Sequence, residues 1–166
     1  LQKIAEVFRE QKLYKKALHT LEQALQIAEK QNFSNRKTHI YSSLGRTYYS
    51  QSKYKKALVF YHKVLDTNQN PNDQYLEHKT LRGLGAVHLK LEQNKEAIKY
   101  YKRSAELARK IGDKRDEGIN LESIAHIYRK LGQHQDATDY YKQALKTARE
   151  LGDKKGEGAN LGNIGN

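Results

Sequence analysis

Residues 81–101 read Leu-Arg-Gly-Leu-Gly-Ala-Val-His-Leu-Lys-Leu-Glu-Gln-Asn-Lys-Glu-Ala-Ile-Lys-Tyr-Tyr. Small and apolar residues recur in this stretch at i, i+3, i+4 and i+7, which is the spacing of one face of an α-helix: Leu81, Leu84, Gly85 and His88. A second face with helical spacing starts at Ala97 and continues through Tyr101 and Ala105. The stretch therefore predicts two consecutive helices joined by a short turn.

The pattern recurs along the chain every forty residues. Alanine occupies one phase of four periods: Ala17, Ala57, Ala97 and Ala137. Residues 78–117 and 118–157 share 14 identities in 40 positions. The periods span 1–37, 38–77, 78–117 and 118–157, with a partial one at 158–166. One helix pair cannot bury its own apolar faces, so the repeats predict a single all-α array: a right-handed α-solenoid of stacked helix-turn-helix units without strands.

Residues at the junctions between periods define the predicted helix boundaries. Asn or Gly, which tolerates the left-handed conformation at a helix C-terminus, occupies every junction: Asn32, Asn72, Gly112 and Gly152. Aspartate follows at Asp73, Asp113 and Asp153, where a carboxylate can cap the next helix. Nine helices are predicted, near residues 1–11, 14–30, 34–51, 54–68, 73–91, 94–111, 114–131, 134–151 and 154–166.

Small residues at fixed positions indicate where helices lie close together. Ala97 and its counterparts are expected where the second helix of a period packs on the first. Gly45, Gly85 and Ala125 are expected to let a first helix approach its neighbour with no side chain between them. The last predicted helix has no second helix after it, so its apolar side should be partly uncovered and allow weak end-to-end self-association.

Composition narrows the class of protein. The chain has 166 residues, 37% of them hydrophobic, and no apolar run approaches the roughly 20 residues needed to cross a membrane. It contains no cysteine, which fits a reducing compartment, and we expect a cytoplasmic location. It begins at Leu1 and contains no methionine, so we expect a fragment of a longer protein. A formal net charge of +12 allows an acidic protein, an anionic membrane surface or a nucleic acid as partner, and it also fits a lysine-rich solvated surface.

The order Leu-x-x-Leu-Gly-x-x-His, followed by Ala and then Tyr, resembles the tetratricopeptide repeat in a lengthened form of 40 residues. The segments Gly-Asp-Lys-Arg-Asp-Glu-Gly and Gly-Asp-Lys-Lys-Gly-Glu-Gly, and the ending Asn-Leu-Gly-Asn-Ile-Gly-Asn, are similar to arrays in cyanobacterial and other bacterial signalling proteins and in Leu-Gly-Asn-type polarity adaptors of animals. The resemblance covers the whole chain and implies a helical solenoid that binds other proteins. His88 stands at an aromatic position of the family, so we expect a packed core residue.

Catalytic and metal-binding motifs are not found. No pair of the seven histidines has the i, i+4 spacing with a nearby carboxylate that a zinc-binding helix needs. Carboxylate pairs such as Asp116-Glu117 are explained by a helix N-terminus, and the recurring Gly-Asp-Lys by capping. We therefore predict no enzyme, no cofactor and no metal site. Tyrosine doublets such as Tyr140-Tyr141 leave base stacking open, although one tyrosine of each falls in the core phase.

A binding surface is the remaining functional feature. In arrays that the chain resembles, the side of the first helices opposite the packed side lines a concave groove, and the centre of that groove is basic here. We expect these groove side chains to be free of any role in covering the core. The predicted partner-binding residues are Arg46, Tyr49, Lys79, Arg82, Lys90, His126, Arg129 and Lys130.

The sequence thus predicts a protein–protein interaction scaffold. Its expected ligand is an acidic or amphipathic peptide or helix, from another protein or from its own parent chain. Two alternatives remain at this stage. One is a helical repeat that binds nucleic acid, and the other is a peptide-sensing regulatory domain of a larger signalling protein.

Overall fold

The computed structural model describes residues 1–67 and 73–165. Within these residues it contains nine α-helices and no strand. Their bounds are α1 Gln2–Glu10, α2 Tyr14–Lys30, α3 Ser34–Ser50, α4 Tyr54–Thr67, α5 Gln74–Lys90, α6 Asn94–Ile111, α7 Lys114–Lys130, α8 His134–Leu151 and α9 Lys154–Gly165. The predicted boundaries are confirmed to within one or two residues, and the predicted ends at 68 and 166 lie outside the described residues.

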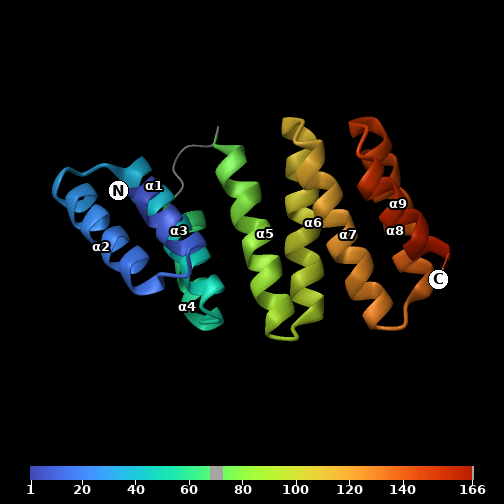
Figure 1. Cartoon of the computed structure of the whole chain (residues 1–166), viewed down its shortest axis with the longest axis horizontal. Coiled ribbons are helices and arrows are strands. Elements are labelled where there is room, and N and C mark those ends of the chain that lie inside the picture. Colours follow the sequence, from blue (N-terminus) through green and yellow to red (C-terminus); the bar gives the residue numbers. More distant parts are fainter. Residues whose placement is uncertain (68–72, 166) are drawn as a thin grey trace.

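Each helix packs on the next to form one continuous row (Figure 1). The first helices of the repeats are α1, α3, α5, α7 and α9, and the second helices are α2, α4, α6 and α8. The N-terminus and the C-terminus lie at opposite ends of the row. The described residues therefore form a stack of helix-turn-helix units, as the forty-residue period predicts.

The junctions between repeats have the predicted geometry. Asn32, Gly112 and Gly152 adopt positive φ angles of 53°, 80° and 67°. Asn72 lies outside the described residues. The carboxylates of the three junction aspartates each accept a hydrogen bond of 3.0 Å from the backbone N–H three residues on, so they cap α5, α7 and α9: Asp73, Asp113 and Asp153.

A second set of left-handed residues lies in the turns within the repeats. Lys12, Ser52, Glu92 and Gly132 have φ angles between 59° and 74° and are spaced forty residues apart. Only Gly132 is a residue that adopts this conformation without a steric penalty. The sequence does not reveal this feature, because lysine, serine and glutamate rarely adopt a positive φ angle.

The alanine positions are confirmed as close helix contacts. Ala17, Ala57 and Ala97 are completely buried, and Ala137 is nearly so. The role predicted for the glycines is wrong, because a tyrosine ring lies where no side chain was expected. A Cβ atom at Gly45 would stand 2.8 Å from the Tyr61 ring. One at Gly85 would stand 3.0 Å from the ring of Tyr101.

His88 packs at the edge of the core and is only half-buried. Its ring stacks on Tyr100 with centroids 5.1 Å apart, and its Nδ1 hydrogen-bonds the side-chain oxygen of Gln93 at 2.6 Å. The packed position predicted for it is therefore confirmed, whereas full enclosure is not.

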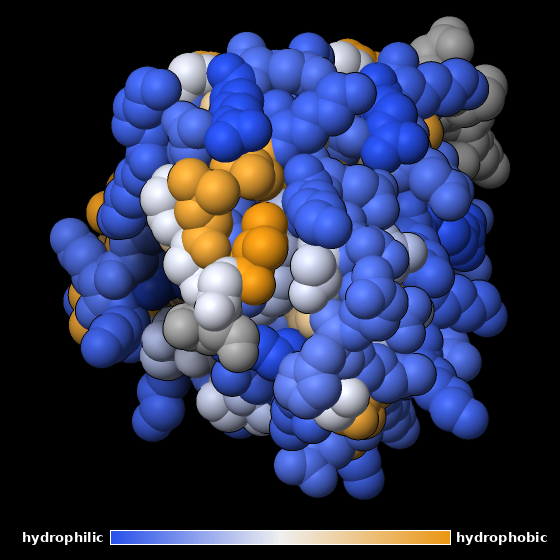
Figure 2. Space-filling model, turned by 90° about the vertical axis from the view of Figure 1, so that its right-hand side faces the viewer, coloured by the Kyte–Doolittle hydropathy of each residue, from blue (hydrophilic) through white to orange (hydrophobic). Residues whose placement is uncertain are grey.

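The C-terminal end of the row, which faces the viewer in Figure 2, is mostly hydrophilic with a small hydrophobic area. Leu151 and Leu161 are each 47% exposed. The apolar side of α9 is thus partly uncovered, as expected for a helix with no second helix packed after it.

Candidate functional site

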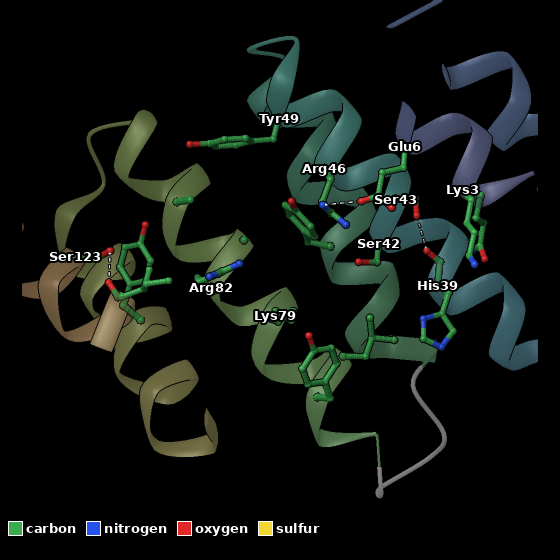
Figure 3. A pocket seen from close by; sticks show the side chains of 18 residues that line it. Lys3, Glu6, His39, Ser42, Ser43, Arg46, Tyr49, Lys79, Arg82 and Ser123 are labelled. Atoms are coloured by element: carbon green, nitrogen blue, oxygen red, sulfur yellow. Dashed lines mark hydrogen bonds and ion pairs between the residues drawn. The ribbon is translucent and has the colours of Figure 1, made fainter. Parts of the chain in front are cut away.

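A cavity of about 680 Å³ lies on the side formed by the first helices. We call it the central pocket. Its walls come from α1, α3, α5 and α7 (Figure 3). One tyrosine of α4 and one of α6 also line it. The polar and aromatic lining residues include Lys3, Glu6, His39, Ser42, Ser43, Arg46, Tyr49, Tyr61, Tyr75, Lys79, Arg82, Tyr101 and Ser123.

The eight predicted site residues divide into two groups. Arg46, Tyr49, Lys79 and Arg82 line the central pocket, so α3 and α5 bring these four together. The other four lie elsewhere, on α5 and α7: Lys90, His126, Arg129 and Lys130.

His126 and Arg129 take part in contacts with the next helices. The Nδ1 of His126 lies 2.7 Å from the Tyr141 hydroxyl, and Nη1 of Arg129 donates to the Asn163 side-chain oxygen at 3.0 Å. Burial lowers the pKa of His126, and the nearby Arg129 cation lowers it further. These two residues join α7 to α8 and α9, while Lys90 and Lys130 are exposed.

Two tyrosines that the sequence assigns only to the core reach the central pocket. The ring of Tyr61 is clamped between α3 and α5, because Cβ atoms at Gly45 and Gly83 would stand 2.8 and 2.7 Å from it. Tyr101 packs in the same way on Gly85. The sequence signal that could have located these tyrosines is the glycines Gly45, Gly83 and Gly85, because each leaves the space in which a tyrosine ring packs.

Burial disfavours ionisation of these phenols further. It raises the pKa of Tyr61 and that of Tyr101 to about 12, although the Arg46 and Arg82 cations oppose the rise at Tyr61. At neutral pH both hydroxyls therefore remain protonated and can donate a hydrogen bond.

Three basic side chains of the pocket form ion pairs within the molecule: Arg46, Lys79 and Arg82. The two oxygens of Asp116 bind Lys79 Nζ at 2.6 Å and Arg82 Nη1 at 2.8 Å. Arg46 Nη2 lies 3.1 Å from Glu6 Oε1. Asp116 is 4% exposed, so the helix N-terminus explains only part of its role. Lys79 and Arg82 also neutralise a buried carboxylate, and their substitution would disturb the fold.

His78 lies beside this ion-pair network and is completely buried. Its Nε2 is 3.6 Å from Asp113 Oδ2, and its Nδ1 is 3.7 Å from Asp116 Oδ2. Burial lowers the pKa of His78, and the cations Lys79 and Arg82 lower it further, against the two carboxylates, which raise it. The histidine is therefore neutral at neutral pH.

His78, Asp113 and Asp116 are the only group of potential metal ligands within the described part of the chain. The Nζ of Lys79 already stands 2.6 Å from Asp116 Oδ2, and Arg82 binds the other oxygen. Because two cations oppose a third at the same carboxylate, the arrangement fits an ion-pair network and does not favour a metal ion.

The aromatic residues of the repeats stack on one another. Ring centroids lie 5.3 Å apart in the stacked pair Tyr48–Phe60 and 5.5 Å apart in Tyr128–Tyr140. The Nζ of Lys102 lies over the latter two rings, at 5.9 and 5.5 Å from their centroids. One face of each ring is thus used inside the protein, which weakens the argument for base stacking.

Comparison with known proteins identifies the class. The family model of the tetratricopeptide repeat matches residues 1–70 and 76–165. The chain therefore belongs to the tetratricopeptide repeat family, whose members typically mediate protein–protein interaction. No curated protein matches the sequence. Among the described residues, no helix combines the length and the apolar character needed to span a membrane.

Solved structures of related arrays share the fold. Aspartyl phosphate phosphatase F from Bacillus subtilis matches with a TM-score of 0.88 at 19% identity, over 96% of this chain and 42% of the other. A signal transduction ATPase with a tetratricopeptide repeat sensor, from Pyrococcus horikoshii, matches with a TM-score of 0.85 at 27% identity, over 98% and 25%. A Rap protein complexed with Competence and Sporulation Factor matches with a TM-score of 0.81 at 23% identity, over 93% and 43%. The chain thus spans less than half the length of these proteins.

Proposed function

We propose that this array is a protein-interaction module that binds a peptide or helical segment of a partner in the central pocket. The observation that carries the proposal is the pocket itself, a cavity of about 680 Å³ to which four successive first helices contribute side chains. Arginine and tyrosine, which are enriched at binding hot spots, line it. Binding without catalysis agrees with the general role of this family as scaffolds.

The lining residues favour an acidic or amphipathic segment. Four lining side chains are cationic, and Glu6 is the only carboxylate among them. Arg46 is half-exposed and Lys3 is exposed, so both can reach a ligand without leaving a buried partner. The phenols of Tyr61 and Tyr101 add hydrogen-bond donors beside apolar ring surface. An acidic side chain next to an apolar one would match this surface.

A binding selection tests the proposal. Peptides are selected from a random library on the immobilised protein, and the best one is titrated against variants. Lys3→Glu with Arg46→Glu should weaken binding at least about tenfold, or about 1.4 kcal/mol, because attraction becomes repulsion. Arg82 is left unchanged because it neutralises Asp116.

The matched control is Lys55→Glu with Lys95→Glu, two exposed lysines of α4 and α6, which changes the net charge equally. The control pair should bind the selected peptide like the unmodified protein. Equal losses in both pairs would show that total charge governs binding. Such a result would favour nucleic acid, whose binding weakens steeply with salt.

A second candidate is a sensor domain within a signalling protein. The likeness to the repeat sensor of the Pyrococcus ATPase, at 27% identity over 98% of this chain, supports it. A sensor should change shape on binding, so the selected peptide should alter the radius of gyration measured by X-ray scattering. An unchanged radius would favour a passive scaffold.

A further inference from the structure

A second hollow, of about 280 Å³, lies between α7, α8 and α9. We call it the α7–α9 recess. Small residues such as Gly118, Ala144 and Gly156 line it, together with four charged residues: Arg115, Glu122, Asp153 and Lys155. Ile119 borders both this recess and the central pocket, so the recess continues the binding side toward the C-terminal end.

The repeat supplies a direct comparison for this recess, because every residue has a counterpart forty positions earlier. Gly118 corresponds to His78, and Gly156 corresponds to Asp116. In the preceding repeat the imidazole of His78 is completely buried between its neighbours. The α7–α9 recess is thus the same place in the next repeat, with the ring removed.

The aspartate beside the ring of His78 has a counterpart in the next repeat, Asp153, although the Asp113 carboxylate stands too far from the ring nitrogen for a hydrogen bond. Asp113 Oδ1 accepts the backbone N–H of Asp116 at 3.0 Å, which leaves Oδ2 at 3.6 Å from His78 Nε2. Asp153 Oδ1 accepts the N–H of Gly156 at the same distance. Its carboxylate lines the recess, and its Oδ2 stands 2.7 Å from where a Cβ of Gly156 would be.

The preceding repeat therefore indicates that a histidine side chain fits the α7–α9 recess. We propose that the α7–α9 recess binds a histidine side chain presented by a partner protein, with the ring between α7 and α8 and its N–H donated to Asp153. A Cβ at Gly118 would meet Thr147 only at an ordinary contact distance of 3.5 Å, so the space accepts a side chain. The proposal goes beyond the proposed function, because the recess lies outside the central pocket and either site can fail without the other.

The test uses 4-methylimidazole, which is the histidine side chain cut at Cβ, and records amide chemical shifts by NMR at mildly alkaline pH. Titration should shift Gly118, Asp153 and Gly156 with a dissociation constant in the millimolar range. The blocked peptide acetyl-Gly-His-Gly-amide should bind at least as tightly, and acetyl-Gly-Leu-Gly-amide should not bind. The ring 4-methylthiazole has the same shape without an N–H donor and should bind at least tenfold more weakly.

Two variants locate the site. Gly118→His fills the recess with the ring of the chain itself and should abolish the shifts caused by 4-methylimidazole. Asp153→Asn keeps a capping oxygen and removes the acceptor, so it should weaken binding at least tenfold. The control Gly162→His adds the same side chain to α9 where nothing lies within 4 Å, and it should change nothing. Absence of 4-methylimidazole binding, binding that survives Gly118→His, or failure of acetyl-Gly-His-Gly-amide to bind would each overturn the proposal.

Discussion

The third and fourth repeats have the same helix-turn-helix arrangement and differ at two places, which are the junction to the next repeat and the turn within the repeat. The junction after α6 is filled by His78 and by the carboxylate of Asp116. The matching junction after α8 has glycine at both positions and remains hollow. The turn within the third repeat forces Glu92 to φ 60°, whereas Gly132 relieves the same turn in the fourth. The helical period and the helix caps are therefore enough to stack the repeats. The side chains that fill each junction can differ from one repeat to the next.

Emptying the filled junction should have the largest effect. His78→Gly removes a completely buried ring and puts glycine inside α5. We expect a loss of about 3 kcal/mol in unfolding free energy, from the cavity and from the lower helix propensity. Chemical denaturation followed by circular dichroism measures it. A change below about 1 kcal/mol would contradict this expectation and show that the third repeat also tolerates an empty junction.

Neutralising the buried carboxylate should cost less. Asp116→Asn retains the shape and removes the charge that holds Lys79 and Arg82, which can then turn to solvent because both are partly exposed. We expect a loss of about 1 to 2 kcal/mol, below the value for breaking a fully buried pair. The matched change Asp139→Asn, on the exposed side of α8, should leave the denaturation midpoint unchanged.

The same junction makes stability depend on pH. Because burial lowers the pKa of His78 in the folded state, the unfolded chain takes up a proton first as pH falls below about 6.5. Stability is therefore complete above that pH and decreases below it until the folded histidine also titrates. His78→Thr, the residue found at position 38, should lose less stability than the unmodified protein between about pH 7 and about pH 5. Parallel slopes in the two proteins would contradict a neutral buried histidine.

Relieving the strained turn should have the smallest effect and the opposite sign. Glu92→Gly gives the third repeat the residue that the fourth already has. We expect a gain of about 0.5 to 1 kcal/mol, because glycine adopts positive φ without a steric penalty and this gain exceeds its entropic cost. Thermal unfolding of the variant checks it. Glu96→Gly, inside α6, serves as the control and should be destabilising.

Most of the fold was predictable and only part of the candidate site was. The forty-residue period locates all nine described helices, because helical spacing of apolar residues is a local property of the chain. It also places Arg46 and Arg82 on the side where the central pocket lies. It could not place Tyr61 there, since its ring passes through gaps at Gly45 and Gly83, on two different first helices.

By itself, the sequence determined the all-α fold class, the helix boundaries, the helix caps and the family. Each of these features depends on residues that lie within one helical turn or one forty-residue period of one another. Only the tertiary structure decided which charges are free. Asp116 and Arg82 are 34 residues apart in the chain, and their pairing depends on how α5 and α7 lie beside each other. The structure also decided that the place filled by His78 stays open at Gly118, because a hollow exists only between packed helices.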